Sequence, residues 1–269
     1  MDSGPQPWMG ATLGGVGSTG QDDMIEDTFT AVVAGALARS DFVPPAANEA
    51  RTIVFACEAL AMHVPVAALM LDAGESRRAG RFRFEHDRAR YTLAHATWRV
   101  VLSACLGVAP SGIPLTTAPS GQPTLPGTGF STSLSHAGDW VAVAVCRGAT
   151  TGIDIERIPS RVRLAEMIDT VCTPAEARRI SLLDASARES ALLGLWTRKE
   201  ALLKAFGVGL AVDPAAVDAA TDGLVAPPPV AGAVPACWVG GLDLPEGLIG
   251  ALAIPDSVIR VEQHRLAWG

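Results

Sequence analysis

The order of apolar and polar residues along the chain predicts a mixture of helices and strands. An acidic start at residues 22–27 leads into the apolar run AVVAGALA, which predicts a helix over residues 22–40. Pro44-Pro45 then breaks the chain before a strand in TIVFACEAL. The segment from Arg81 to Leu106 predicts a long amphipathic helix, because its large side chains recur three and four residues apart. These side chains are Tyr91, Ala94, His95, Trp98, Val101, Leu102 and Cys105.

The second half of the chain repeats this alternation of strands and helices. Prolines and glycines punctuate residues 108–127 too often for regular structure, so this segment is predicted to be a loop. Thr173-Pro174-Ala175-Glu176 has the spacing of a capping box and predicts the start of a helix. A second helix is predicted from Ser186 to Phe206, ending at Gly207. Strands are expected at residues 130–135, 140–147, 152–158, 237–242, 248–254 and 258–264. This layout predicts an α+β fold of two halves, each with a helix against strands.

Composition narrows the class of protein. With 269 residues, of which 49% are hydrophobic, the chain can bury one large core or two modest ones. The five cysteines are scattered singly without a C-x-x-C pair, which favours a reducing cytoplasm and no zinc site. The first 21 residues lack the pattern of a secretory signal and are rich in Gly, Ser, Thr and Pro, so a mobile tail is expected.

Charge and hydropathy argue against two kinds of partner. No apolar run approaches the roughly 20 residues that span a bilayer, so no membrane association is expected. The formal net charge of −7 and the absence of a long Lys/Arg block argue against a nucleic-acid partner. Any phosphate-bearing ligand must therefore meet a local basic cluster.

A pair of acids in TGIDIERI is the first candidate for chemistry. Asp154 and Glu156 are two residues apart between isoleucines, so in a strand both carboxylates project from one face. Two adjacent hard oxygen ligands suit magnesium, which completes its shell with water and substrate phosphates. The structural alternative is an edge strand with a solvated acidic face.

The helix WTRKEALLK is the second candidate. Glu200 and Lys204 lie four residues apart and share a helix face, an arrangement that is often only a surface salt bridge. Most of this helix is apolar, however, so its charged residues lie on or beside a buried element. Buried charges are costly unless they are paired or coordinate an ion, which favours a functional role.

Two weaker signals concern phosphate binding. Ser135-His136 stands at a predicted strand end before a turn, where a structural polar pair is the simpler interpretation. An arginine-rich run precedes the long helix and by default forms a solvated face, although guanidinium groups match phosphates well. Its members are Arg77, Arg78, Arg81 and Arg83, with Arg88 and Arg90 further on.

Together these motifs resemble a known family. GIDIE, followed about forty residues later by W-x-x-K-E-A-x-x-K-x-x-G and preceded by F-S-x-S-L-S-H, resembles the 4'-phosphopantetheinyl transferases, specifically the monomeric two-lobed type that activates peptide and polyketide synthases. The resemblance runs from about residue 50 onward, with motif-level detail over residues 81–210. It implies a pseudo-dimer of two similar lobes, each a long helix on a small antiparallel sheet, with the active site in the cleft between them.

The resemblance also implies a division of the chain and roles for its residues. Residues 1–48 would be a partly disordered N-terminal extension without a family counterpart, residues 49–135 a first lobe and residues 136–269 a second lobe carrying the magnesium site. Asp154, Glu156 and Glu200 would bind Mg²⁺, with Glu200 also the candidate base. The coenzyme A contacts implied are Ser135, His136, Lys199, Lys204, Arg77, Arg81 and Arg90, and Gln122 occupies a position where the family usually has a basic residue.

The activity implied is transfer of 4'-phosphopantetheine from coenzyme A to a serine of an acyl or peptidyl carrier protein, by a cytoplasmic monomer. Glu200, Lys204 and His136 would be its catalytic residues. The alternatives are a catalytically silent module that binds coenzyme A or a carrier, and another magnesium-dependent phosphotransfer enzyme. No G-x-x-x-x-G-K-[ST] loop occurs in the sequence, which argues against a P-loop enzyme.

Overall fold

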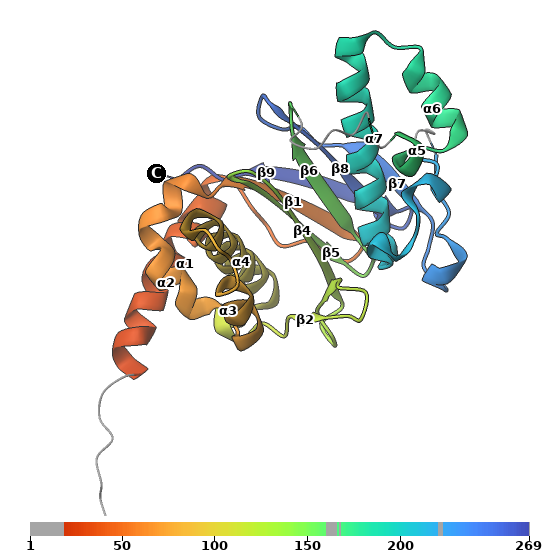
Figure 1. Cartoon of the computed structure of the whole chain (residues 1–269). Coiled ribbons are helices and arrows are strands. Elements are labelled where there is room, and N and C mark those ends of the chain that lie inside the picture. Colours follow the sequence, from red (N-terminus) through yellow and green to blue (C-terminus); the bar gives the residue numbers. More distant parts are fainter. Residues whose placement is uncertain (1–18, 160–165, 167, 220–222, 269) are drawn as a thin grey trace, which may run out of the picture.

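The computed structural model describes residues 19–159, 166, 168–219 and 223–268. Helices α1 to α4 lie on one side of the strands and α5 to α7 on the other (Figure 1). A mobile tail was predicted for residues 1–21. Residues 1–18 lie outside the described residues, and residues 19–21 form the start of α1. Within the described ranges, no helix is both long and apolar enough to cross a membrane.

The first lobe is built on a sheet of four strands. The order is β4-β5-β1-β9, with β1 at Glu49–Ala56, β4 at Phe130–Ala137, β5 at Trp140–Arg147 and β9 at Arg260–Arg265. Strand β1 pairs antiparallel with β5 but parallel with β9, so this sheet is mixed rather than antiparallel as predicted. Since β9 follows the entire second lobe in the sequence, the chain returns to the first lobe near its end.

Helices cover one face of this sheet. They are α1 (Thr19–Arg39), α2 (Val64–Ala67), α3 (Ala73–Ala79) and α4 (Glu85–Leu106). Helix α1 belongs to this core, because Phe29 and Val33 are fully buried against the same cluster as Phe55 and Trp98. The prediction of a separate extension up to residue 48 is therefore wrong for α1. Helix α4 starts at Glu85 rather than at the predicted Arg81, because the backbone is still extended at Phe84.

The second lobe is a three-stranded antiparallel sheet with helices against it. Its order is β6-β8-β7, with β6 at Gly152–Arg157, β7 at Cys237–Gly241 and β8 at Leu248–Pro255. The helices are α5 (Ile168–Val171), α6 (Pro174–Ser181) and α7 (Ala185–Phe206). The capping box at Thr173 and Glu176 is confirmed, and Gly207 ends α7 with a φ of +72°. Helix α7 begins one residue before the predicted Ser186, and the carboxylate of Asp184 accepts from the backbone N–H of Ala187.

The remaining regular segments are short. The predicted loop 108–127 contains a small hairpin of β2 (Thr116–Thr117) and β3 (Pro123–Thr124). The strand expected in TIVFACEAL ends at Ala56, and the chain then turns into a 3₁₀ helix. The 3₁₀ turns are Glu58–His63, Ala68–Met70, Pro110–Gly112, Gly209–Ala211, Pro214–Ala216 and Pro229–Ala231.

Serine side chains of β4 join the two lobes. The hydroxyls of Ser133 and Ser135 accept hydrogen bonds from the backbone N–H groups of Ile153 and Ile155, at 3.1 and 3.3 Å. Because alternate residues of a strand face the same side, these serines form a ladder along the edge of β6. The boundary predicted between residues 135 and 136 falls inside β4, and the division between the two sheets lies after β5 instead.

Candidate active site

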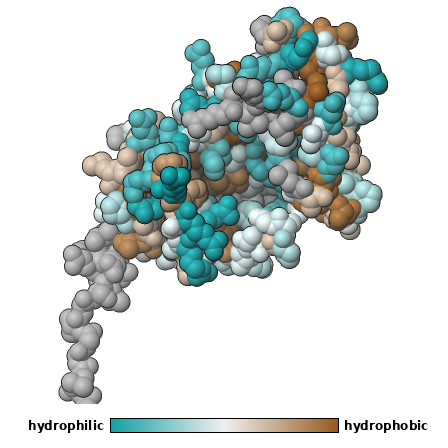
Figure 2. Space-filling model, viewed as in Figure 1, coloured by the Kyte–Doolittle hydropathy of each residue, from teal (hydrophilic) through white to brown (hydrophobic). Residues whose placement is uncertain are grey.

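A cavity of about 680 Å³ lies in the cleft between the lobes. Helices α3 and α4 and the 108–127 loop form one wall, and β4, β6 and α7 form the other. Figure 2 shows hydrophilic side chains over the region of α3, beside the hollow between the lobes. The predicted site residues that line this cavity are Arg77, Arg81, Ser135, His136, Asp154, Glu156 and Lys204.

A close approach of β6 to α7 brings the second-lobe residues together. A Cβ atom on Gly152 would lie 2.0 Å from the backbone oxygen of Ala201, so only glycine permits this contact. As a result, the ammonium of Lys204 on α7 reaches the carboxylate of Asp154 on β6, with a distance of 2.7 Å from Nζ to Oδ1. The same ammonium donates to the backbone oxygen of Ile153 at 2.9 Å.

Asp154 lies at the centre of this group and is only 5% exposed. Its Oδ1 atom accepts from Lys204 and also from the Ser135 hydroxyl, at 2.8 Å. Its Oδ2 atom is buried and accepts no hydrogen bond. A buried carboxylate oxygen without a partner is costly, and a bound cation would satisfy it.

Glu156 and Glu200 complete a set of mutually repelling carboxylates. Burial, and then the charge of Asp154, raises the pKa of both side chains, while Lys204 acts in the opposite direction. Glu156 also contributes to the raised pKa of Glu200, so the three acids predicted together are electrostatic neighbours. The Oε1 atom of Glu200 is, like Asp154 Oδ2, buried without a partner.

Glu200 faces a smaller neighbouring cavity of about 240 Å³. Lys204, Leu134, Gly121 and Pro123 line both this cavity and the larger one, so the two spaces share a wall. Among the described residues, no group of three or more His, Cys, Asp and Glu side chains could hold a metal ion as the side chains stand. The Lys204 ammonium occupies the cationic position beside Asp154.

His136 is exposed to solvent and lines the larger cavity. Surrounding protein atoms lower its pKa, and the positive charges of Lys204, His95 and Arg90 lower it further. Arg90 lines a small adjoining cavity with His136 and forms ion pairs with Asp87 and Asp139. His136 therefore lies where several positively charged groups converge.

The structure contradicts the prediction that Lys199 contacts a coenzyme. Its side chain is fully buried inside the second lobe, with Nζ 2.6 Å from the Glu176 carboxylate. The ammonium also donates to the backbone oxygens of Pro214 and Val217, at 2.9 and 2.7 Å. With all its donors used inside the protein, Lys199 is a structural residue.

Gln122 is placed against α7 rather than in the larger cavity. Its side-chain amide donates to the backbone oxygen of Lys204 at 2.8 Å. Its Oε1 atom lies close to Gly207, where a Cβ atom would be only 2.5 Å away. Gln122 thus anchors the 108–127 loop to the end of α7, and it lines the smaller cavity but not the larger one.

Several residues of the first-lobe wall were not predicted. Asp72, Glu75, His95, Tyr91 and Trp98 line the larger cavity. The rings of His95 and Tyr91 stack with centroids 4.0 Å apart. Arg78 also lines the cavity. Its place in the arginine run beside Arg77 and Arg81 could have predicted this. The spacing of Asp72 and Glu75 in DAGE is that of a capping box and could have predicted the start of α3, but their contacts with Arg99 and His95 join residues distant in sequence.

Comparisons with known proteins agree with this geometry. A model of the 4'-phosphopantetheinyl transferase superfamily matches residues 150–238, and a model of the N-terminal part of 4'-phosphopantetheinyl transferase matches residues 60–148. The two matched segments meet between β5 and β6, where the two sheets divide.

Curated relatives carry the same family name. A phosphopantetheinyl transferase of Thraustochytrium sp. is 35% identical over 186 residues, which cover 62% of this chain and 63% of the relative. The 4'-phosphopantetheinyl transferase HetI of Nostoc sp. is 32% identical, covering 54% and 62%, and psf-1 of Bacillus pumilus is 33% identical, covering 49% and 56%. The matches thus span less than two thirds of each of these relatives. With tandem family matches over both lobes, the chain belongs to the 4'-phosphopantetheinyl transferase superfamily.

Proposed function

We propose that this protein transfers the 4'-phosphopantetheine group from coenzyme A to a serine hydroxyl of an acyl or peptidyl carrier protein. The observation that carries the proposal is a pair of buried carboxylate oxygens without partners, Asp154 Oδ2 and Glu200 Oε1, in two cavities that Lys204 lines together. Family membership supports the reaction class, and the arginines of the opposite wall support an anionic substrate.

We further propose that Asp154, Glu156 and Glu200 hold a magnesium ion. All three supply the hard oxygen ligands that magnesium prefers. The charge of Asp154 raises the pKa of Glu156 and of Glu200, so the site carries the excess negative charge that a divalent cation relieves. When bound, the ion would neutralise charge on the diphosphate of the coenzyme.

The protein's own groups account for the remaining chemistry. The serine oxygen forms a bond to the phosphorus that bears pantetheine, and the bond from that phosphorus to the bridging oxygen breaks, releasing adenosine 3',5'-bisphosphate. Glu200 is the candidate acceptor of the serine proton, because a carboxylate with a raised pKa is a better base near neutral pH. Lys204 places a positive charge beside the diphosphate, where negative charge increases during the reaction.

The walls of the cleft would orient the substrates. Arg77 and Arg81 are exposed on the first-lobe wall and lie opposite Lys204 across the cavity, so an anionic coenzyme would be held between them. His136 and Ser135 line the same cavity from β4. The formal net charge of −7 means that an acidic carrier would be attracted by the local arginines and not by the overall field.

The direct test measures the mass of the product. The protein is incubated with coenzyme A, magnesium chloride and several apo carrier domains, and each carrier is weighed by mass spectrometry. We expect at least one carrier to gain the mass of phosphopantetheine, and to lose that gain when its acceptor serine is replaced by alanine. Binding of coenzyme A without any mass gain would reject transfer and identify a silent binding module.

A further inference from the structure

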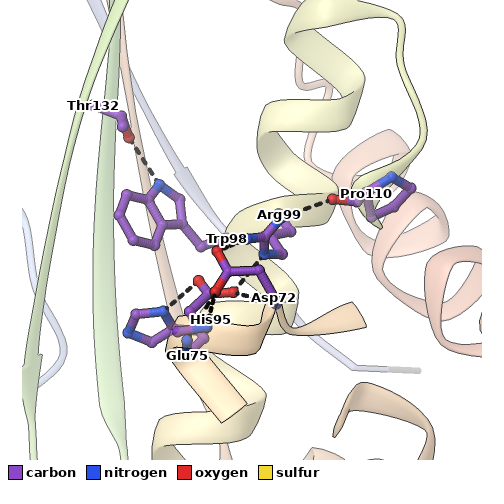
Figure 3. Close-up of polar contacts among 8 residues, drawn as sticks. Asp72, Glu75, His95, Trp98, Arg99, Pro110 and Thr132 are labelled. Carbon is purple, nitrogen blue, oxygen red and sulfur yellow. Dashed lines mark hydrogen bonds and ion pairs between the residues drawn. The ribbon is translucent and has the colours of Figure 1, made fainter. Parts of the chain in front are cut away.

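A buried arginine in the first lobe holds the cleft wall that faces the proposed magnesium site. Arg99, in the middle of α4, is only 1% exposed. Its guanidinium donates to Glu75 Oε2 and Asp72 Oδ2, both at 2.7 Å, and to the backbone oxygen of Pro110 at 3.2 Å. Figure 3 shows these groups converging on the guanidinium from outside α4. A planar guanidinium can serve several acceptors in fixed directions, whereas an ammonium acts as a point charge.

The two acids that Arg99 binds are also the residues that start α3. Asp72 is the N-cap and accepts from the backbone N–H groups of Gly74 and Glu75, at 2.7 and 2.8 Å. Glu75 completes the capping box by accepting from the backbone N–H of Asp72 at 3.0 Å. Helix α3 has only seven residues, far fewer than an isolated helix needs for stability. The capping box and the contacts of its two acids with Arg99 therefore help to hold α3 against α4.

The same contacts reach the cavity surface. Glu75 uses its second oxygen, Oε1, to bind His95 Nδ1 at 2.8 Å, which fixes the His95 ring in the cavity wall. Burial alone would raise the pKa of Glu75, but hydrogen bonds from His95 and the Asp72 backbone, together with the charges of His95 and Arg99, lower it overall. Glu75 is therefore an anion that binds α4 through both Arg99 and His95.

Arg99 connects three segments that line the larger cavity. Helix α3 carries Arg77 and Arg78, α4 carries His95, and Pro110 belongs to the loop that continues to Thr117 and Gly121. Arg99 itself does not line the cavity. Its contacts instead fix the positions of the residues that do.

We propose that Arg99 is a positioning residue for coenzyme binding, which acts through the α3 capping box to place the arginines and His95 against the anionic coenzyme. The inference rests on the proposed transfer reaction. It predicts that weakening the Arg99 contacts raises the KM for coenzyme A while the kcat at saturating coenzyme is largely kept, because the proposed magnesium site on the other wall is untouched.

Two variants test this without deleting the buried charge. Asp72→Asn keeps a good helix N-cap but removes the charge that pairs with Arg99, and Arg99→Lys keeps the positive charge but loses the planar fork. We expect both to raise the KM and the calorimetric Kd for coenzyme A by about tenfold, since small misplacements of binding groups have large effects. The kcat should stay within about threefold, because the residues proposed for catalysis lie on the other wall.

A matched control separates positioning from general destabilisation. Val101→Ala removes buried packing from the same helix at a residue that does not line the cavity, and its KM should stay unchanged even if its melting temperature falls. An unchanged KM in Asp72→Asn and Arg99→Lys, with normal transfer by the unaltered protein, would overturn the inference. Equal KM increases in Val101→Ala would also overturn it. Absence of transfer in the unaltered protein would instead reject the proposed function.

Discussion

Two lysines on α7, Lys199 and Lys204, differ in whether their surroundings are complete without a ligand. Lys199 is fully buried, and its ammonium contacts Glu176 and two backbone oxygens. Lys204 is partly exposed to the cleft and pairs with Asp154, whose second oxygen has no partner. The first group is complete without a ligand, whereas the second leaves buried acceptors unsatisfied and neighbouring carboxylates in mutual repulsion.

The difference between the surroundings of Lys199 and Lys204 predicts different effects of substitution. Buried polar groups in folded proteins nearly always find partners, so a satisfied buried pair needs no further explanation. A buried carboxylate oxygen without a partner, beside carboxylates of raised pKa, does require an explanation, and a bound cation provides that explanation. We therefore expect substitutions at Lys199 to affect the free energy of unfolding and substitutions around Lys204 to affect turnover.

The largest effect is expected from Lys199→Met. This change leaves the buried Glu176 carboxylate without its counter-charge and should lower the free energy of unfolding by about 3–5 kcal/mol. Urea denaturation measures it, with Arg178→Met on the exposed surface of α6 as a control that removes the same charge. A stability loss as small as that of the control would contradict the structural role of Lys199.

Turnover should respond most strongly to Asp154→Asn. The substitution keeps the shape of the side chain but removes the central charge of the three acids, so kcat should fall by about 10²–10³. The melting temperature should change little, because repulsion with Glu156 and Glu200 is relieved as the Lys204 pair is weakened. Asp256→Asn on the exposed surface serves as the control. Unimpaired transfer by Asp154→Asn would remove this carboxylate from the site.

Magnesium and pH should change stability together. The raised pKa values of Glu156 and Glu200 mean that the folded chain binds more protons than the unfolded chain, so their contribution to the free energy of unfolding decreases as pH rises from 4.5 through the raised values. Magnesium at 100 times its Kd should restore about 2.7 kcal/mol at neutral pH.

Urea denaturation in EDTA and in magnesium chloride, from mildly acidic to neutral pH, measures both effects. Glu200→Gln removes one of the titrating groups and should reduce the pH dependence as well as the gain from magnesium. Equal stability with and without magnesium at every pH would argue against a cation at these acids.

The smallest effect is expected from Gln122→Ala. It removes one hydrogen bond from the loop to the Lys204 carbonyl and should lower the free energy of unfolding by about 0.5–1.5 kcal/mol. Because this contact anchors the loop near Lys204, the KM for coenzyme A should rise modestly. Ser120→Ala, on the exposed part of the same loop, should change neither quantity. An unchanged Gln122→Ala variant would show that the loop is held by its other contacts.

The sequence predicted local structure well because the relevant signals are local. The capping box at Thr173 and Glu176, the glycine that ends α7 and the alternation of acids and isoleucines in β6 each depend on residues a few positions apart. The same alternation correctly placed Asp154 and Glu156 toward the cleft. Periodicity also identified α4, although its first turn begins after the arginine run.

Contacts between distant residues could not be predicted in the same way. Lys199 and Glu200 are adjacent on a mostly apolar helix. Only the folded chain shows that Lys199 forms an ion pair with Glu176. The ion pairs of Arg99 with Asp72 and Glu75 likewise join residues 24 and more positions apart. The parallel pairing of β9 with β1 joins residues about 210 positions apart, which no local pattern encodes.

This return of β9 to the first lobe has a consequence for biosynthesis. As the chain leaves the ribosome, β1, β4 and β5 emerge early, but the fourth strand follows only after residue 259. Until then the edge of β1 that β9 later covers has unpaired backbone groups, which can pair with the strand of another nascent chain. Chaperone dependence during expression should therefore concentrate on the first lobe, and removal of the last strand should increase aggregation even though the groups proposed for catalysis remain in the chain.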